Sequence, residues 1–262
     1  MKLFQAEQKL EWSPALPSEF SEAYKLGGYD ENRILQVMWK YLMREANAQR
    51  AWVRINHHLP ETMTQADPLD ILEFSTAHGA MLEIWRHFGH RVRGTDYNWA
   101  THESTAVHKG VRKPWHRKAL EELTSQTHSH SRAVMVEGWP YQPIIESLGL
   151  DVDLFDGADR PYPYDDKSYD VVCCYQAIEA YANPEDWLDI LAEFCRIARR
   201  TVVVGFNPPP VFEAENEEYL VKARAAWIAM QQYNANGFRT VFFEMGRTRR
   251  GIHPTAVKLV AV

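Results

Sequence analysis

Short apolar runs alternate with stretches of helical periodicity along most of the chain, from residue 69 to the C-terminus. Apolar runs of this length between turn residues predict buried strands, and the stretches between them predict helices. The runs occupy residues 69–74, 91–96, 151–155, 169–175, 201–206, 239–245 and 256–262. Strands separated by helices form βαβ units, so the alternation predicts an α/β fold with a mostly parallel sheet. The last two runs have no helix between them and predict an antiparallel C-terminal hairpin at one edge.

The region before the first strand is predicted to be an N-terminal helical cap. Apolar residues recur at helix spacing between residues 19 and 56, and the pair Asp67-Pro68 closes the region. We therefore divide the chain into a cap at residues 1–66 and a main α/β domain at residues 67–262.

Within the main domain, the helices between strands can be delimited from the sequence. One long segment cannot be assigned to a single helix or strand. Helices are expected at residues 79–88, 184–196 and 213–233. Gly89 stands where a glycine commonly ends a helix. The extended segment 97–150 breaks the alternation, and its pattern predicts three short elements: a helix near 118–123, a strand at 133–136 and a helix after Pro143.

Composition limits the location and the partners of the protein. The 262 residues carry a net charge of −6 with a pI near 6.0, which disfavours nucleic acid as a partner. The three cysteines include the adjacent pair Cys173 and Cys174 inside an apolar run, and they have no disulfide-framework spacing. No stretch reads as a membrane span or a signal peptide, so we expect a cytoplasmic protein without a membrane partner.

The segment from Glu73 to Gly79 joins the first strand to the first helix and is the strongest candidate for a binding loop. Small residues let the backbone approach a ligand closely, and the start of the helix offers free N–H groups. The segment resembles the loop of class I S-adenosylmethionine-dependent methyltransferases, in which an acidic residue precedes three alternating glycines. Glu73 takes the acidic place and Gly79 the third glycine, while Ser75 and Ala77 replace the first two. Restoring glycine at these two positions is expected to lower stability slightly, because glycine adds unfolded-state entropy.

A second acidic residue falls where the family binds the ribose of its cofactor. Asp96 ends the second strand and follows Ser75 at an interval of 21 residues, the spacing of the family. The two oxygens of a carboxylate match the two hydroxyls of a vicinal diol. The resemblance also implies that Tyr97 lies beside the adenine ring.

A third stretch, residues 161–172, resembles the segment that leads into the fourth strand of the family. The acidic residue that binds adenine in the family falls on Ala158, and its neighbour Asp159 is the candidate for that role. Gln176 follows the fourth strand, where the family contacts its ligand. The cofactor-binding residues implied by the resemblance are Glu73, Ser75, Ala77, Gly79, Asp96, Tyr97, Asp159 and Gln176. No motif identifies a catalytic base.

The resemblance implies a seven-stranded, mostly parallel methyltransferase-type sheet with the antiparallel C-terminal hairpin. It further implies that S-adenosylmethionine donates a methyl group to an O, N or S atom of a small molecule, leaving S-adenosylhomocysteine. Because two loop glycines are replaced, a second interpretation stays open: an inactive methyltransferase-like protein that acts as a cofactor sensor or an interaction scaffold. A nicotinamide-binding fingerprint would place Ser75, Ala77 and Ala80 at its three glycines and is therefore disfavoured. A homo-oligomer also stays open.

Two other motifs are interpreted as structural. Several histidines lack a cysteine or carboxylate at zinc-site spacing, so we expect no metal; they are His57, His58, His78, His128 and His130. The run Asn207-Pro208-Pro209-Pro210 resembles a box of amino-methylating DNA enzymes but follows the fifth strand instead of the fourth. We interpret it as a rigid turn.

Overall fold

The computed structural model describes residues 14–29, 39–97, 139–208, 216–248 and 251–262. The chain divides into two compact units. The described part of the first unit ends at Tyr97 and resumes at residues 139–154; the second unit holds the residues from Phe155 onward. The helix expected near 118–123, the strand expected at 133–136, the pair His128 and His130, and Pro209 and Pro210 lie outside the described residues.

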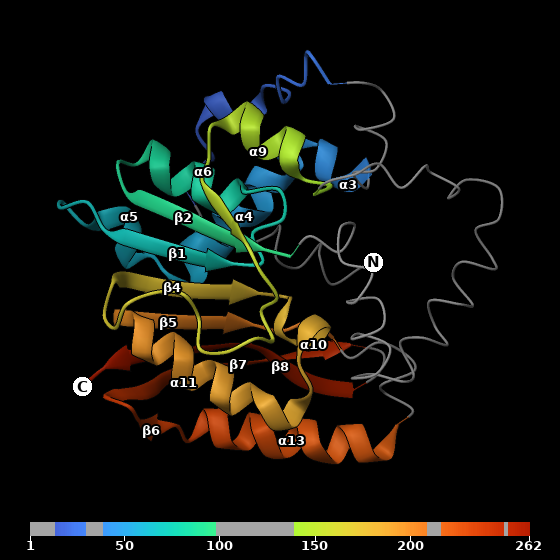
Figure 1. Cartoon of the computed structure of the whole chain (residues 1–262), viewed down its shortest axis with the longest axis vertical. Coiled ribbons are helices and arrows are strands. Elements are labelled where there is room, and N and C mark those ends of the chain that lie inside the picture. Colours follow the sequence, from blue (N-terminus) through green and yellow to red (C-terminus); the bar gives the residue numbers. More distant parts are fainter. Residues whose placement is uncertain (1–13, 30–38, 98–138, 209–215, 249–250) are drawn as a thin grey trace. The chain divides into compact units, whose positions relative to one another are not determined.

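Three parallel strands form the sheet of the first unit (Figure 1). They are β1 (Asp70–Phe74), β2 (Arg91–Asp96) and β3 (Val152–Leu154). β2 lies between the other two, with Asp70 opposite Arg91 and Gly94 opposite Val152. All three coincide with expected strands.

Helix α6 (Ala80–His87) connects β1 to β2 and packs against both. Its first six residues are buried, which explains the strongly apolar sequence between the two strands. The helix ends as the sequence predicts, because Gly89 has a left-handed φ of 90° and its N–H donates to the Arg86 carbonyl at 3.0 Å. The chain then turns directly into β2.

The helical cap is shorter than the sequence predicts. Its described elements are η1 (Ser18–Ser21), α3 (Trp39–Leu42), α4 (Arg44–His58) and α5 (Glu61–Thr64), and α9 (Gln142–Leu148) follows later in the chain. The prediction of a helical pattern from residue 19 onward is wrong for residues 22–29, which are not helical. Gly28 there has a φ of 101°, which a right-handed helix does not allow.

Long α4 packs on α6, and its first residue ties the N-terminal segment to the unit. The Arg44 guanidinium donates to Glu83 of α6 at 3.0 Å through Nε. Its Nη1 donates to the carbonyls of Glu19 and Glu22, both at 2.9 Å. One arginine thus links three separate segments of the first unit.

The second unit begins with two parallel strands and ends with the expected antiparallel hairpin. β4 (Tyr169–Tyr175) pairs with β5 (Ala198–Gly205), and β5 pairs with β8 (Gly251–Ala261) in the antiparallel sense. β8 in turn pairs with β7 (Phe238–Thr248) along its whole length. The hairpin strands therefore extend beyond the expected runs, 239–245 and 256–262, toward each other. Cys173 and Cys174 are buried inside β4.

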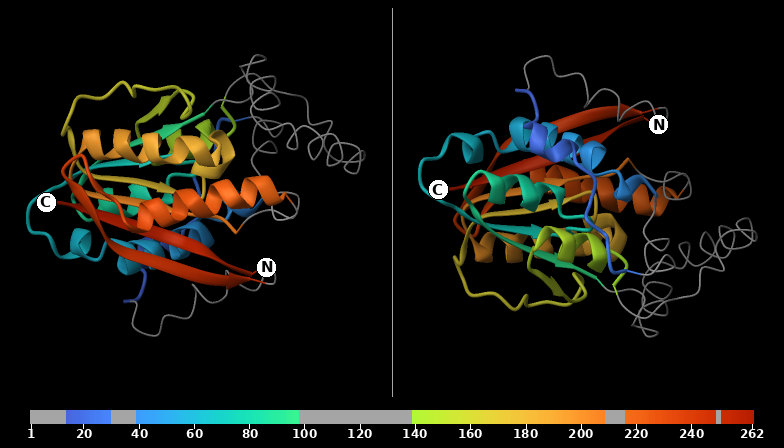
Figure 2. Two further views of the ribbon diagram at one scale, coloured as in Figure 1. Left: turned by 90° about the horizontal axis from the view of Figure 1, so that it is seen from below. Right: turned by 90° about the horizontal axis from the view of Figure 1, so that it is seen from above.

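Helices cover this part of the sheet (Figure 2). α10 (Ile178–Tyr181) and η2 (Pro184–Asp186) precede α11 (Trp187–Ile197), and α13 (Glu217–Gln231) follows β5. α11 packs on β4 and β5, α13 packs on β7 and β8, and the two helices contact each other. The helices expected at 184–196 and 213–233 are thus confirmed in their described parts.

The strand order is β3-β2-β1-β4-β5-β8-β7-β6, with only the C-terminal strands antiparallel. This is the order of the class I methyltransferase fold, so the expected fold class is confirmed. The sheet has eight strands instead of seven because β6 (Asn234–Ala235) folds back onto β7. Asn236 and Gly237, with φ of 54° and 73°, form the turn that the sequence did not reveal.

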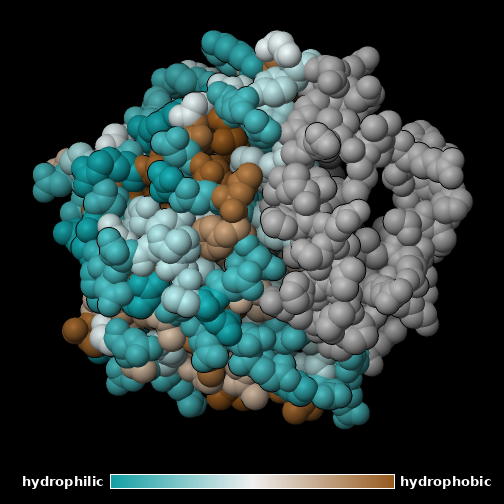
Figure 3. Space-filling view, in the orientation of Figure 1, coloured by the Kyte–Doolittle hydropathy of each residue, from teal (hydrophilic) through white to brown (hydrophobic). Residues whose placement is uncertain are grey.

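Hydrophilic residues dominate the described surface on the face shown in Figure 3. Among the described residues, no helix combines the length and apolar character that crossing a membrane requires.

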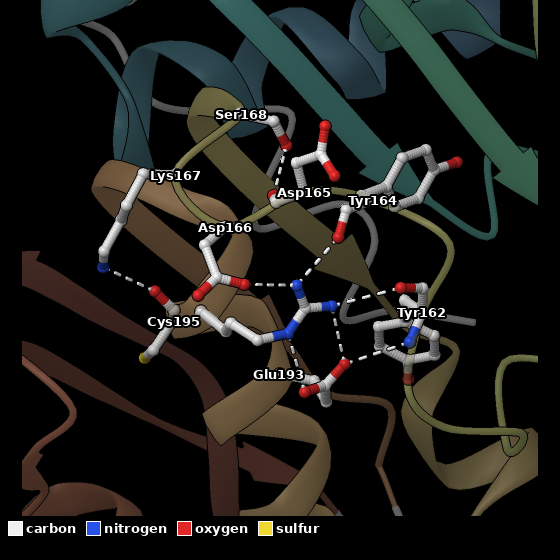
Figure 4. Close-up of polar contacts among 9 residues, drawn as sticks. Tyr162, Tyr164, Asp165, Asp166, Lys167, Ser168, Glu193 and Cys195 are labelled. Atoms are coloured by element: carbon white, nitrogen blue, oxygen red, sulfur yellow. Dashed lines mark hydrogen bonds and ion pairs between the residues drawn. The ribbon is translucent and has the colours of Figure 1, made fainter.

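Arg196, in the last turn of α11, fastens the loop before β4 onto the helix (Figure 4). Its Nη1 donates to the Tyr164 carbonyl at 2.7 Å and to Asp166 Oδ1 at 2.8 Å, and its Nη2 donates to the Tyr162 carbonyl at 3.1 Å. Both oxygens of Glu193 accept from the same guanidinium, each at 2.9 Å. Arg196 thereby lowers the pKa of Glu193. The planar fork of arginine satisfies four groups at once.

Replacing Arg196 by lysine should lower the free energy of unfolding by about 1–3 kcal/mol, because a single ammonium cannot meet this planar set of acceptors. Urea unfolding followed by circular dichroism measures the change. Arg200→Lys is the matched control, since the exposed Arg200 approaches Asp170 only at 3.5 Å. Equal losses in the two variants would show that the Arg196 contacts contribute nothing specific.

Candidate functional site

The loop between β1 and α6 keeps a glycine-like backbone at positions that hold no glycine. Ser75 and Ala77 have φ of 57° and 51°, and Gly79 has φ of 71°. A residue with a Cβ costs roughly 1–2 kcal/mol in this left-handed region. The loop therefore has the conformation for which alternating glycines are suited, at the expense of backbone strain at two of the three positions.

Hydrogen bonds on both sides of the strained residues hold the loop in place. The Thr76 N–H donates to the Thr95 carbonyl of β2 at 2.8 Å, and its hydroxyl donates to the Glu73 carbonyl at 3.0 Å. The Gly79 N–H returns to the Thr76 carbonyl at 3.1 Å. Thr76, which no motif identifies, takes part in all three of these hydrogen bonds.

Gly79 is favoured by its left-handed backbone, and two side chains pack closely against it. It precedes α6 directly, and a Cβ at this position would lie 2.7 Å from Leu150 Cδ1 and 2.8 Å from Ile145 Cδ1. Real Cβ atoms do not approach other atoms so closely. A side chain here would displace the ends of Leu150 and Ile145, and the φ of 71° strains any residue other than glycine.

Asp96 lies at the carboxyl end of β2 and collects hydrogen bonds from three places in the chain. Its Oδ2 accepts from the Ala77 N–H at 3.2 Å and from the Trp139 indole N–H at 3.1 Å. Its Oδ1 accepts from the N–H of Tyr97 at 2.8 Å. The structure thus brings the predicted ribose carboxylate into direct contact with the predicted loop. No motif in the sequence links Trp139 to Asp96.

Glu73, at the carboxyl end of β1, is buried with 6% of its surface exposed. Burial raises the pKa of Glu73 to about 8, the negative charge of Asp96 adds to this, and Arg54 opposes it. Within the described part of the chain, Oε2 of Glu73 has no hydrogen-bond partner. The carboxyl group is therefore largely protonated near neutral pH.

A row of aromatic rings lies beside the loop. The centroids of Trp139 and Tyr141 are 6.0 Å apart, those of Tyr141 and Tyr41 are 5.5 Å apart, and those of Tyr41 and His78 are 5.2 Å apart. His78 belongs to the loop, and its Nδ1 accepts from the Ala80 N–H at 3.2 Å. When neutral, the imidazole therefore carries its proton on Nε2.

Asp159 and Gln176 belong to the second unit. Asp159 is exposed in a turn, where its N–H donates to the Asp156 carbonyl at 2.9 Å. Gln176 directly follows β4 with a left-handed φ of 56°. The role of both residues in binding a cofactor stays a prediction.

Asn207 joins the ends of β4 and β5. Its side-chain amide donates to the Gln176 carbonyl at 2.7 Å, and its backbone N–H donates to Glu179 Oε1 at 2.6 Å. Because its amide group is bonded to the backbone, Asn207 fixes the turn after β5. This agrees with the structural interpretation of the Asn-Pro run in its described part.

Comparison with known proteins gives structural matches only. No family model matches the sequence, and no curated protein matches it. A magnesium protoporphyrin IX methyltransferase from Synechocystis PCC 6803, with bound S-adenosylhomocysteine, is 13% identical; the match covers 84% of this chain and 85% of that one, with a TM-score of 0.45. The PH0226 protein from Pyrococcus horikoshii OT3 is 13% identical, with 89% and 99% covered and a TM-score of 0.47.

A third match is a 1,6-didemethyltoxoflavin-N1-methyltransferase from Burkholderia thailandensis with bound 1,6-didemethyltoxoflavin and S-adenosylhomocysteine. It is 16% identical, the match covers 83% of this chain and 79% of that one, and the TM-score is 0.41. At these identities and TM-scores the matches bear on neither acceptor nor mechanism. The fold assignment depends on the strand order of the chain itself.

The variant Ser75→Gly, Ala77→Gly should keep or gain stability, which corrects the slight loss expected from the sequence. Glycine relieves left-handed strain of roughly 1–2 kcal/mol per site and adds unfolded-state entropy of roughly 0.4–1 kcal/mol per site. Over the two sites, the free energy of unfolding should therefore hold or rise by up to about 3 kcal/mol, as measured by urea titration.

Ala80→Gly is the matched control for this prediction. Ala80 lies in α6 directly after the loop, where glycine should cost about 1 kcal/mol or more. A double variant that loses as much stability as this control would show that Ser75 and Ala77 are not strained.

Glu73→Gln should change how stability depends on pH. The native pKa of about 8 exceeds the ordinary value of 4.5, so the native state retains a proton that the unfolded chain releases. The stability that the native state gains from burying the protonated carboxyl group is fully present below pH 4.5. It is lost as the pH rises through the native pKa of about 8. Because glutamine does not titrate, the stability of the variant relative to the wild type should increase from pH 5 to pH 8.

Urea unfolding at several pH values across this interval measures the difference. Glu45→Gln changes an exposed carboxyl of the same unit and serves as the control. Parallel pH curves for the wild type and Glu73→Gln would contradict the burial of a protonated carboxyl group at this position.

Proposed function

We propose that this protein binds S-adenosylmethionine and transfers its methyl group to a small-molecule acceptor. The observation that carries the proposal is the bond between Asp96 and the Ala77 N–H. It joins the carboxylate that suits the ribose diol to the loop that suits close approach of a ligand. Both lie at the carboxyl ends of parallel strands, the edge at which α/β sheets bind ligands.

The residues of the first unit fit this cofactor chemically. Asp96 has two acceptor oxygens, the number that suits a pair of hydroxyls, and a diol would share them with the N–H groups of Ala77, Tyr97 and Trp139. The loop presents a backbone with left-handed residues at Ser75, Ala77 and Gly79, and α6 begins directly after it. Glu73 contributes a buried carboxyl whose Oε2 is unpaired among the described residues. Asp159 and Gln176 of the second unit remain candidates for further contacts.

When bound, S-adenosylmethionine supplies an activated methyl group on a sulfonium. The contribution of the chain is then to hold and orient the two reactants, since positioning alone supplies much of the rate in such a transfer. Asp96 and the loop orient the nucleoside. No residue of the described chain is assigned as a general base.

A small-molecule acceptor agrees with the charge of the chain. The net charge of −6 provides no general attraction for a polyanion. The interpretation as a scaffold without cofactor rested on the replaced glycines. The left-handed backbone at Ser75 and Ala77 supports cofactor binding over that interpretation, because both residues have a φ that glycine adopts readily.

Calorimetric titration with S-adenosylhomocysteine tests the proposal. The wild type should bind with measurable heat and should melt at a higher temperature with saturating ligand. Asp96→Asn should weaken binding about tenfold or more, because a hydrogen bond to a charged acceptor contributes roughly 1.5–3 kcal/mol. Asp70→Asn is the matched control, since Asp70 starts β1 at the opposite end of the strands, where it bonds Arg91.

Two results would contradict the proposal. If the wild type showed neither heat nor a higher melting temperature, binding would be absent and a scaffold role would take its place. If Asp96→Asn and Asp70→Asn bound equally well, Asp96 would not be the ribose ligand.

A further inference from the structure

Trp139 is nearly fully buried, with 4% of its surface exposed, yet its indole N–H is directed at an ionisable side chain instead of a backbone carbonyl. The acceptor is Oδ2 of Asp96, at 3.1 Å. The same oxygen accepts the Ala77 N–H at 3.2 Å. One carboxylate oxygen therefore receives one donor from the loop and one from the segment that precedes α9.

The three donors to Asp96 approach from different parts of the chain, and together they fix the rotation of its side chain. The backbone N–H of Tyr97 holds Oδ1, while the loop and the indole hold Oδ2. Two of the donors are backbone groups whose positions follow from the strand and the loop. The indole is the only side-chain donor among these three, so it is the one that a substitution can remove.

The position of the indole is itself fixed by the row of rings. Trp139 packs edge-on against Tyr141, Tyr141 packs against Tyr41, and Tyr41 packs against the loop residue His78. Tyr41 and Tyr141 also pack on the small apolar cluster around Tyr24 and Ile144. The row thus begins at Trp139, whose indole binds Asp96, and ends at His78 in the loop whose Ala77 N–H also binds Asp96.

We infer that Trp139 is a positioning residue for the ribose subsite, which holds the Asp96 carboxylate in the orientation that receives a vicinal diol. The inference rests on the proposed function, because it assigns Trp139 to the same site. An ionised carboxylate with a fixed orientation binds a diol without first losing rotational freedom. Without the indole N–H, the N–H groups of Tyr97 and Ala77 still hold one oxygen each, but Oδ2 loses one of its two donors and is held less firmly.

The effect of Trp139 should therefore depend on the ribose hydroxyls of the ligand. Trp139→Phe keeps an aromatic ring and removes the N–H. It should weaken binding of S-adenosylhomocysteine about tenfold, the size expected for one hydrogen bond to a charged group. It should leave the affinity for the 2′,3′-dideoxy analogue of S-adenosylhomocysteine within about twofold, because that ligand makes no diol contact with Asp96.

Trp85→Phe is the matched control in the same unit. Its indole N–H donates to the Thr62 hydroxyl at 2.9 Å, and Trp85 is fully buried. This variant should lose stability without changing the affinity for either ligand. A second test uses Asp96→Asn as background, in which adding Trp139→Phe should cause little further loss of affinity. If Trp139→Phe does not fold, Trp139→Leu also removes the indole N–H, adds no other donor, and takes the same tests.

The outcomes separate the two proposals. An equal loss of affinity for both ligands, or no loss for either, would overturn the role of Trp139 while leaving cofactor binding by the wild type intact. A loss that adds fully to that of Asp96→Asn would also overturn it, because Trp139 would then act independently of Asp96. If the wild type bound neither ligand, the proposed function and this inference would both be overturned.

Discussion

The carboxylate of Asp96 is the group on which the carboxyl edge of the first unit depends. Strand β2 delivers it, and donors from the loop, the strand end and the segment before α9 converge on it. A buried or half-buried carboxylate is stable only when polar partners replace the water that it has lost. The convergence therefore serves the fold directly, since it closes the loop against β2 and draws the start of α9 toward both. Any ligand of Asp96 must join an arrangement that already exists.

The left-handed loop shows why the replacement of glycine need not abolish a binding loop. Ser75 and Ala77 place a Cβ where glycine would carry none, and the backbone adopts the required φ nonetheless. The hydrogen bonds of Thr76 and the bond from the Ala77 N–H to Asp96 form in this conformation and offset the strain. Residues with side chains also have fewer unfolded conformations than glycine. The loop therefore trades strain in the folded state for lower entropy in the unfolded state.

The order of the strands and helices could be predicted because each leaves a local pattern in the sequence. The position of Asp96 could also be predicted, since a strand and a short interval determine it. Trp139 could not, because it bonds a residue 43 positions away and its own neighbourhood has no periodicity. The cap was overextended for a related reason: residues 22–29 are not helical, and the φ of 101° at Gly28 excludes a right-handed helix there. The protonation of Glu73 depends on burial, which is a property of the packed unit and leaves no local signal.

Two carboxyl groups at the same edge of the sheet in the first unit differ in their hydrogen-bond partners and in their protonation. Glu73 and Asp96 end neighbouring strands, but Asp96 receives three N–H donors whereas Glu73 is enclosed with one oxygen unpaired within the described chain. Donors favour the ionised form of a carboxyl group, and burial favours the neutral form. The charge of Asp96 itself contributes to the raised pKa of Glu73, so the two environments are linked. An ionised group can only accept hydrogen bonds, whereas a neutral one can also donate. The pair therefore presents an acceptor at β2 and a protonated group at β1, a difference that the same two residue types in water would not show.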